Sequence, residues 1–479
     1  MKRFYFLLLC LWSSIGLAQT QEKGYAIRVQ VKGLQDSTCY LSHYFGFSQY
    51  LVKDTARADT SGVLLFKGKQ ALPEGLYFVS LPNKKRIELV VTDKEPRFSL
   101  STDTTDLIEH MKVDSASKEN MGLYSYLKYV QSQQRQVEIL QAFNGENPNE
   151  GNVITQQRIR AIRNEMYSYL NRLASAYPDL LVGKYIKAST EPRLPRPPMY
   201  PNGGYDTAFV AKAVRRHFFD NIDFSDERLV RSPYLQRRLE SFFERVVVPQ
   251  TDSVKASCDR ILALASANKE VMRYAVWYIT NYFEASKVIG ADAIFIYLAE
   301  EYYLKGKVET DSSVLRNLAD RIKTLKPLLI GKPMPEMNFF DPNGKLQPLK
   351  NVQAEVTFVV FYDPLCKKCR AKLPALINFY KKHKNESIAV YAVMVEKYDG
   401  MWKQMLNEFK IKDLWINVWD KTGKTDFRKE FDVYSTPMIY VLTPDKKIGL
   451  KKVEVEQLEA ILTMYKQGKQ ASAKATPKK

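Results

Sequence analysis

The stretch that decides the fold is a ten-residue segment around two cysteines, Phe361-Tyr362-Asp363-Pro364-Leu365-Cys366-Lys367-Lys368-Cys369-Arg370. The segment completes an apolar, β-branched run, Val356 to Tyr362, that is typical of a strand buried on both faces of a sheet. A short turn, Asp363 to Leu365, then leads into a segment predicted to be helical from Cys366 to His383. Cys366 is therefore expected where a strand ends and a helix begins.

This position of Cys366 favours an ionised sulfur. Unpaired amide groups and the positive end of the helix dipole stabilise an anion at a helix N-terminus. Lys367 and Lys368 add positive charge beside the sulfur and should stabilise the thiolate further. A lowered thiol pKa makes Cys366 the predicted nucleophile, and Cys369, one helical turn further, is placed to attack the mixed disulfide and release the substrate.

A zinc half-site and an inert structural disulfide are the alternatives for the same pair. A closed zinc site needs two further Cys or His ligands, and the four histidines, His43, His110, His217 and His383, show no such spacing. The strand–turn–helix setting favours thiol–disulfide chemistry over both. We therefore expect no metal, and no cofactor beyond a redox-active Cys366–Cys369 disulfide.

Strands and helices alternate after the cysteine pair, in the order Ile388–Val395 (strand), Trp402–Phe409 (helix), Lys424–Phe431 (helix) and Met438–Leu442 (strand). Alternation of this kind predicts an α/β domain with helices on the faces of a partly parallel sheet. We place this domain at residues 330–467. The basic tail, residues 468–479, has nothing to bury and is expected to be disordered.

Two motifs carry a resemblance to a known family. The cysteine segment, with Pro374 five residues after Cys369, resembles the active-site segment of the TlpA/ResA-like thioredoxin family. Thr436-Pro437, after Tyr434-Ser435 and before the strand at Met438, is similar to the family's cis-proline loop. An X-Pro bond is the kind that adopts the cis form at low cost. The resemblance implies a thioredoxin-like fold in which this loop lies against the reactive cysteine and pairs with the substrate through backbone groups.

Two positions depart from the family's pattern. Thioredoxin has a buried acid six residues before its first cysteine, where this chain has Val360, and ResA-like proteins often have Glu three residues after the second cysteine, where this chain has Lys372. The general base for Cys369 is therefore not identified, and Asp363 or a water is the alternative. The redox direction also stays open among oxidant, reductant and isomerase, because thiolate stabilisation favours the reduced form and raises the potential.

Two further regions precede this domain. Residues 19–103 alternate apolar and polar positions from Tyr25 to Val31, and short strands follow at Val63–Phe66, Leu76–Leu81, Ile87–Val91 and Arg97–Leu100, which predicts a small antiparallel β-sandwich. Residues 104–329 change to the helical period and predict an all-α domain, in which the aromatic residues pack between helices rather than line a ligand groove. This order of modules resembles multidomain exported oxidoreductases of Bacteroidetes-type bacteria.

The first eighteen residues have the pattern of a cleavable export signal. Lys2 and Arg3 precede an apolar stretch, Phe4–Trp12, and Gly16-Leu17-Ala18 forms a small-residue cleavage site. The pattern predicts export to the periplasm or cell envelope. Cys10 leaves a lipoprotein signal as the alternative, although Leu9 precedes it where a small residue is needed.

The charge distribution and the remaining cysteines bear on possible partners and on disulfide bonds. The net charge of +19 is spread over every segment and no zinc-finger or RNA-binding motif accompanies it, so nucleic acid is not an expected partner. Cys39 and Cys258 fall in different predicted domains and are expected to be buried small residues rather than a bridge.

These observations together predict an exported thiol–disulfide oxidoreductase acting on protein thiols. Cys366 attacks, Cys369 resolves, and Thr436 and Pro437 shape the docking groove, while a membrane or soluble redox partner recycles the pair. The first alternative is a non-catalytic binding or assembly protein on a thioredoxin-like scaffold. The second is a thiol peroxidase, which would surround one reactive cysteine with Thr and Arg and would not use a Cys-x-x-Cys pair.

Overall fold

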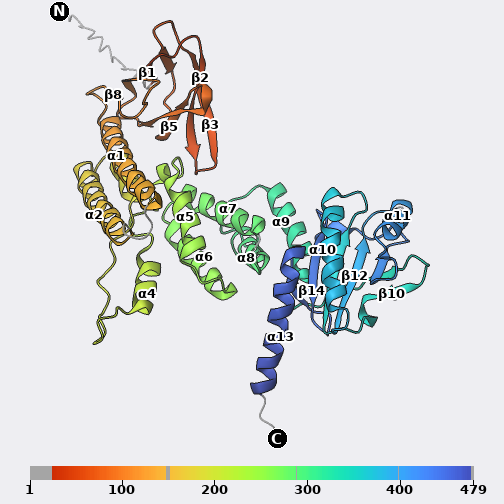
Figure 1. Cartoon of the computed structure of the whole chain (residues 1–479). Coiled ribbons are helices and arrows are strands. Elements are labelled where there is room, and N and C mark those ends of the chain that lie inside the picture. The colour runs from red at the N-terminus through yellow and green to blue at the C-terminus, as the bar shows by residue number, and fades with distance from the viewer. Residues whose placement is uncertain (1–23, 147–151, 287, 398, 476–479) are drawn as a thin grey trace, which may run out of the picture. The chain divides into compact units, whose positions relative to one another are not determined.

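The computed structural model of the chain describes residues 24–146, 152–286, 288–397 and 399–475. The chain divides into two compact units, residues 1–246 and 247–479 (Figure 1). The helical region predicted at 104–329 is thus shared between both units. The predicted export signal, with Cys10, lies outside the described residues. Along the described segments, no helix combines the length and apolarity that a membrane crossing requires.

The first unit begins with strands that form two sheets, ordered β4-β1-β7-β8 and β3-β2-β5-β6. Their bounds are β1 Tyr25–Lys32, β2 Thr38–Phe45, β3 Gln49–Arg57, β4 Val63–Gly68, β5 Gly75–Ser80, β6 Arg86–Val91, β7 Arg97–Asp103 and β8 Lys112–Val113. The predicted alternation is confirmed in β1, where Ile27, Val29 and Val31 are fully buried. The prediction of a wholly antiparallel sandwich is wrong, because β7 pairs with β1 in parallel. The chain passes through the other sheet at β5 and β6 and returns beside β1 in the same direction.

Helices complete the first unit, namely α1 Lys118–Glu146, α2 Asn152–Ala176, α3 Leu181–Ser189, α4 Thr207–His217 and α5 Tyr234–Arg245. Buried polar side chains join α1 to the sandwich and to α3. The Asn120 side chain exchanges two hydrogen bonds with the backbone of Val90, at 2.8 and 2.9 Å. The Glu119 carboxylate accepts the amide hydrogens of Leu181 and Val182 at the start of α3. The unpaired amides of a helix N-terminus thus satisfy a buried carboxylate.

The second unit begins with the helices α6 Thr251–Ala265, α7 Lys269–Ala285, α8 Ala291–Leu298 and α9 Ser312–Leu325, and a π-helical turn, Ala299–Leu304, extends α8. The predicted packing role of the aromatic residues is confirmed for Tyr274, Tyr278 and Phe283, which are buried. Cys258, on α6, is a buried free cysteine, as is Cys39 in the first unit. Both therefore have the predicted role of small core residues.

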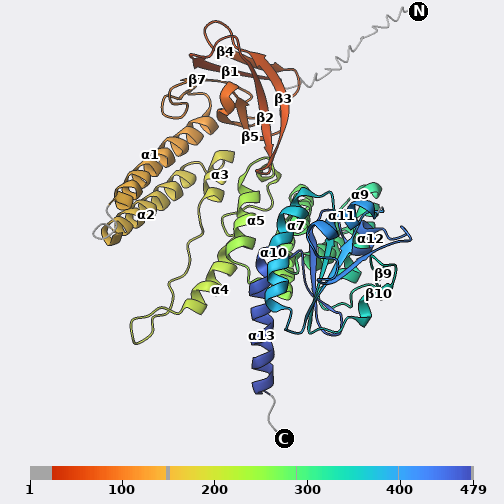
Figure 2. The same cartoon turned by 45° about the vertical axis from the view of Figure 1, so that its right-hand side comes forward.

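A sheet with the order β10-β9-β13-β12-β11-β14-β15 forms the centre of the second unit (Figure 2). Its strands are β9 Asn338–Phe340, β10 Leu346–Pro348, β11 Val356–Tyr362, β12 Ile388–Met394, β13 Ile416–Trp419, β14 Met438–Leu442 and β15 Ile448–Lys451. The predicted central strand is confirmed, since every residue of β11 is buried. β12 runs parallel to β11, whereas β14 on its other side is antiparallel.

The two faces of β11 are covered by different helices. Phe358, Val360 and Tyr362 pack beneath α10 Lys367–His383, α11 Gly400–Glu408 and α13 Leu458–Ala475. Val359 and Phe361 lie in a second core with α12 Phe427–Phe431 and with the segment before the sheet. Helices on both faces explain why the strand is apolar throughout instead of alternating.

Several boundaries differ from the prediction, and some strands, β2 and β3 among them, were not predicted. α12 begins at Phe427 rather than Lys424, because the Asp426 carboxylate caps it and accepts the amides of Arg428 and Lys429. The tail predicted to be disordered from residue 468 is helical to Ala475, since its Lys, Gln and Ala residues extend a helix that the core has already nucleated. The short strands β13 and β15 were not predicted, because four residues carry little periodicity.

A buried ion pair joins the helices of the second unit to its sheet. The Lys451 ammonium, on β15, contacts the Asp292 carboxylate of α8 and donates a hydrogen bond to the Leu328 carbonyl at 2.8 Å. The Lys451 side chain is only 6% exposed. Burying this charge costs free energy of solvation, which its interactions with Asp292 and the Leu328 carbonyl must offset.

We expect Lys451→Ala to destabilise the second unit by about 3–5 kcal/mol, because Asp292 is left as an unpaired buried charge. Urea unfolding followed by tryptophan fluorescence measures this unit, since Trp277, Trp402, Trp415 and Trp419 lie in it and Trp12 lies in the predicted export signal. Lys447→Ala removes an exposed pair with Asp445 and should change the free energy of unfolding by no more than about 0.5 kcal/mol. If the two variants lose the same free energy of unfolding, the buried pair contributes no more to stability than the exposed one.

Candidate active site

The Cys366 sulfur lies at the N-terminus of α10, as predicted. Cys366 is the N-cap residue, and its Sγ accepts the backbone N–H of Cys369 at 3.3 Å. The same sulfur donates its proton to the carbonyl oxygen of Thr436, also at 3.3 Å. The peptide bond between Thr436 and Pro437 is cis, which confirms the prediction for that bond. The two motifs named from the sequence therefore meet at one sulfur atom.

Hydrogen bonds decide the ionisation of Cys366. Burial alone would raise its pKa, but bonds from the Thr436 side chain, from Cys369 and from the amide of Lys368 outweigh burial and hold the pKa below its ordinary value. These groups stabilise the thiolate where it forms. The Thr436 carbonyl, in contrast, can bond only to the protonated sulfur. Loss of the proton thus frees a carbonyl directly beside the thiolate.

Cys369 lies in a contrasting environment. Its side chain is 4% exposed, on the face of α10 that packs against β11. Burial raises the pKa of Cys369 to about 12, and the neighbouring Cys366 acts in the same direction. The first sulfur is therefore ionised more readily than the second.

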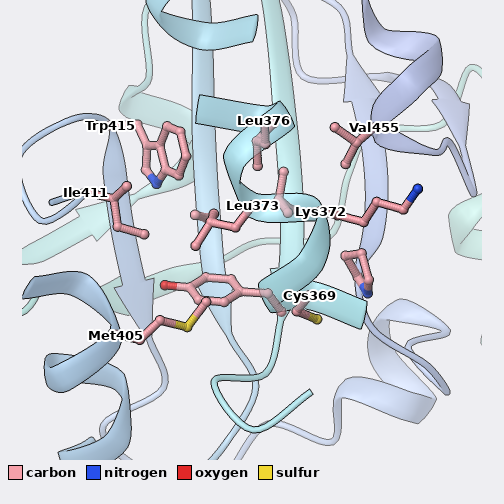
Figure 3. A pocket seen from close by; sticks show the side chains of 12 residues that line it. Cys369, Lys372, Leu373, Leu376, Met405, Ile411, Trp415 and Val455 are labelled. Carbon is pink, nitrogen blue, oxygen red and sulfur yellow. The ribbon is translucent and has the colours of Figure 1, made fainter. Parts of the chain in front are cut away.

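A small apolar cavity borders Cys369 (Figure 3). Its volume is about 20 Å³, which is room for roughly one water molecule. Val360 and Lys372, the two positions where related proteins are expected to carry acids, both line it. The ammonium of Lys372 points away from Cys369 and pairs with the Glu456 carboxylate (Figure 3). None of the residues lining this cavity is an acid that could accept the proton of Cys369.

Of the other residues predicted near the site, Lys367 and Lys368 are exposed and Asp363 stabilises a turn. Lys367 lies on the surface beside the pair. The Lys368 ammonium is 3.3 Å from the Glu454 carboxylate, which offsets part of its charge. The Asp363 carboxylate accepts the amide hydrogen of Leu365 at 2.7 Å and so holds the turn before Cys366.

Two exposed apolar side chains near Cys366 were not predicted to belong to the site. Leu365 is 63% exposed and Tyr434 is 61% exposed. Tyr434 and Thr436 also line a surface groove of about 540 Å³ that extends past Asp363. The sequence could have indicated both residues, because each lies within one of the two motifs. That their side chains are exposed is evident only from the fold.

This geometry defines the class of protein. An unequal pair of thiols at the start of a helix, with a cis-proline loop against the first sulfur, is an arrangement that can carry out thiol–disulfide exchange on a thioredoxin-like fold. Comparisons with known proteins agree. A family model described as "Thioredoxin-like" matches residues 354–448, and one described as "Domain of unknown function (DUF5106)" matches residues 197–321.

Curated relatives match the same part of the chain. The thiol-disulfide oxidoreductase ResA of Bacillus thuringiensis subsp. konkukian is 25% identical over 136 residues, which are 28% of this chain and 76% of the relative. ResA of Bacillus subtilis is 26% identical over 137 residues, 28% of this chain and 73% of the relative. The C-terminal domain of this chain is therefore a TlpA/ResA-like thiol–disulfide oxidoreductase domain.

Solved structures are similar to the chain as well. A domain of a possible thiol-disulfide isomerase from Cytophaga hutchinsonii is 34% identical, with a TM-score of 0.29, and the match covers 30% of this chain and 98% of that one. A thioredoxin-like protein from Bacteroides caccae is 16% identical, with a TM-score of 0.47, and the match covers 57% of this chain and 99% of that one.

The two thiols should differ sharply in alkylation by iodoacetamide. Cys366 should be alkylated with a pH midpoint below the value of about 8.5 of a free cysteine, because its thiolate is stabilised. Cys369 should resist alkylation at neutral pH, because burial favours its protonated form. Peptide mass spectrometry of Cys366→Ser and Cys369→Ser separates the two rates. Equal midpoints for the two cysteines would contradict this assignment.

Proposed function

We propose that the protein is an exported enzyme that exchanges disulfides with the thiols of other proteins through Cys366 and Cys369. The observation that carries the proposal is the placement of the Cys366 sulfur, which is bonded to the N-terminus of α10 and touches the Thr436 carbonyl. The thiol–disulfide oxidoreductase relatives of the domain support the reaction class. The leader-like pattern of residues 1–18 supports export.

The reaction starts from the reduced pair. The Cys366 thiolate attacks one sulfur of a substrate disulfide, so that a mixed disulfide forms and one substrate thiolate leaves. Cys369 then loses its proton and attacks Cys366 Sγ, which forms the Cys366–Cys369 disulfide and releases the second substrate thiolate. Two electrons pass to the substrate, and an external dithiol, the recycling partner, restores the reduced pair. Exchange in the opposite direction uses the same steps in reverse, and no metal or organic cofactor takes part.

Substrate docking is assigned to the groove beside Thr436 and Pro437. The Thr436 carbonyl, released when Cys366 ionises, accepts a backbone N–H of an extended substrate segment. Leu365, next to Cys366 in the chain, and Tyr434, which lines the groove, provide exposed apolar contacts. Lys367 and Lys368 add positive charge that stabilises the thiolate, although Glu454 offsets part of the effect of Lys368.

Cys369→Ser should trap substrates in cells. The variant should hold mixed disulfides on Cys366, because the serine hydroxyl cannot resolve them, and non-reducing electrophoresis should show them as adducts that reductant releases. Cys366→Ser is the matched control and should show no adducts. An empty trap, together with no disulfide reduction by the wild-type chain in an insulin assay, would contradict the proposal and favour a non-catalytic scaffold.

The missing acid beside Cys369 should limit the resolving step. The charge-swapped variant Lys372→Glu with Glu456→Lys keeps the ion pair but places a carboxylate at the edge of the cavity. A general base there should speed resolution by about tenfold at pH 7. The second phase of thiolate release from Ellman's reagent, followed by stopped flow, measures that step.

The first phase of the same reaction reports attack by Cys366 and is the internal control, which the charge swap should change by less than about twofold. Lys382→Glu with Glu459→Lys reverses another ion pair of α10 away from the cavity. That control variant should leave both phases unchanged. An unaltered second phase in the first variant would show that proton removal from Cys369 does not limit resolution.

A further inference from the structure

A side chain from outside the thioredoxin-like match reaches the cis-proline loop, which we define as residues 432–437. Arg321 lies near the end of α9, before the matched region of residues 354–448. α9 and α12 lie side by side in the second unit (Figure 2). The guanidinium of Arg321 is therefore directed at the segment that follows α12.

Arg321 contacts this segment at two points. Its Nη1 is 2.5 Å from Oδ1 of Asp432, and its guanidinium carbon is 5.4 Å from the centre of the Tyr434 ring. The Nε atom faces Glu284 of α7 at 3.4 Å. A guanidinium can serve all three partners at once because it is planar, offers several donors and stacks on aromatic rings.

The contact of Arg321 with Asp432 links α9 to the cis-proline loop. Asp432 ends α12 in the left-handed conformation, with a φ of 55°, and its side chain is 2% exposed. A carboxylate this deeply buried needs a counter-charge, and Arg321 is its near partner, while the Lys452 ammonium lies 3.7 Å from the other oxygen. Asp432 is four residues before Thr436, whose carbonyl contacts Cys366. The position of the loop thus depends on a helix that precedes the matched region of residues 354–448.

We propose that Arg321 is a positioning residue for thiol–disulfide exchange. It holds Asp432 and Tyr434 and so sets the distance between Thr436 and the Cys366 sulfur. The helices α7 and α9, which carry Glu284 and Arg321, thereby belong to the machinery that tunes the reactive cysteine. The role in exchange rests on the proposed function, whereas the effect on Cys366 itself can be measured without a substrate.

The test compares Arg321→Ala with Arg316→Ala in the full-length chain. Arg316 is exposed on the same helix and contacts only Ser312 among the interactions of the described residues. Arg321→Ala should slow alkylation of Cys366 at pH 7 by about fivefold and raise the pH midpoint of that reaction, the size expected when contacting residues are uncoupled. Arg316→Ala should match the wild type. A folded Arg321→Ala with the wild-type rate and midpoint overturns the proposal.

Two further variants separate positioning from folding. Asp432→Asn should reproduce the effect of Arg321→Ala, and the double variant should be no slower than the slower single one, because both act through one contact. Arg321→Lys keeps the positive charge but lacks the planar guanidinium with its several donors, so Cys366 should be alkylated at an intermediate rate. If Arg321→Ala does not fold and Arg321→Lys keeps the wild-type rate and midpoint, the role is structural and the proposal fails.

The same measurements keep this proposal distinct from the proposed function. A changed Cys366 midpoint in Arg321→Ala, in a chain that reduces no insulin, would support positioning and contradict enzymatic exchange. Insulin reduction by the wild type, unchanged in Arg321→Ala along with the midpoint, would support exchange and overturn the role of Arg321.

Discussion

The active site depends on the contact between the Cys366 sulfur and the Thr436 carbonyl, and the sheet brings the two together. β11 and β14 are antiparallel neighbours in which Phe361 pairs with Met438. The end of one strand and the start of the other therefore coincide at one edge of the sheet. Cys366 follows the first strand and Pro437 precedes the second, so a fixed strand register joins motifs far apart in the sequence.

Burial is what makes the two cysteines unequal. Cys366 lies at the helix N-terminus, where amide groups face its sulfur, whereas Cys369 turns into the core one turn later. Hydrogen bonds from Thr436 and from the start of α10 thus lower the pKa of Cys366, whereas burial raises the pKa of Cys369. Apolar residues and Lys372, which pairs with Glu456, line the cavity beside the inner sulfur, so no carboxylate lines that cavity. This asymmetry suits a fast attack followed by a slower, proton-limited resolution.

The helices before the thioredoxin-like domain are part of its structure. Asp292 on α8 pairs with Lys451 of the sheet, and Arg321 on α9 pairs with Asp432 beside the cis-proline loop. Lys451, Asp292 and Asp432 are each at most 10% exposed. In both pairs the partner charge therefore takes the place of water around a buried ion. The second unit is therefore better regarded as one folded body than as a domain with a separate helical neighbour.

The sequence by itself determined the features that rest on local pattern. The bounds of β11 and β14, the helix after Cys366 and the cysteine pair followed from hydrophobic periodicity, turn residues and spacing, which act over a few residues. Only the tertiary structure decided which distant residues meet. The parallel pairing of β1 with β7, the helical tail and the contact of Arg321 with Asp432 depend on packing between segments, and periodicity carries no information about partners across such separations.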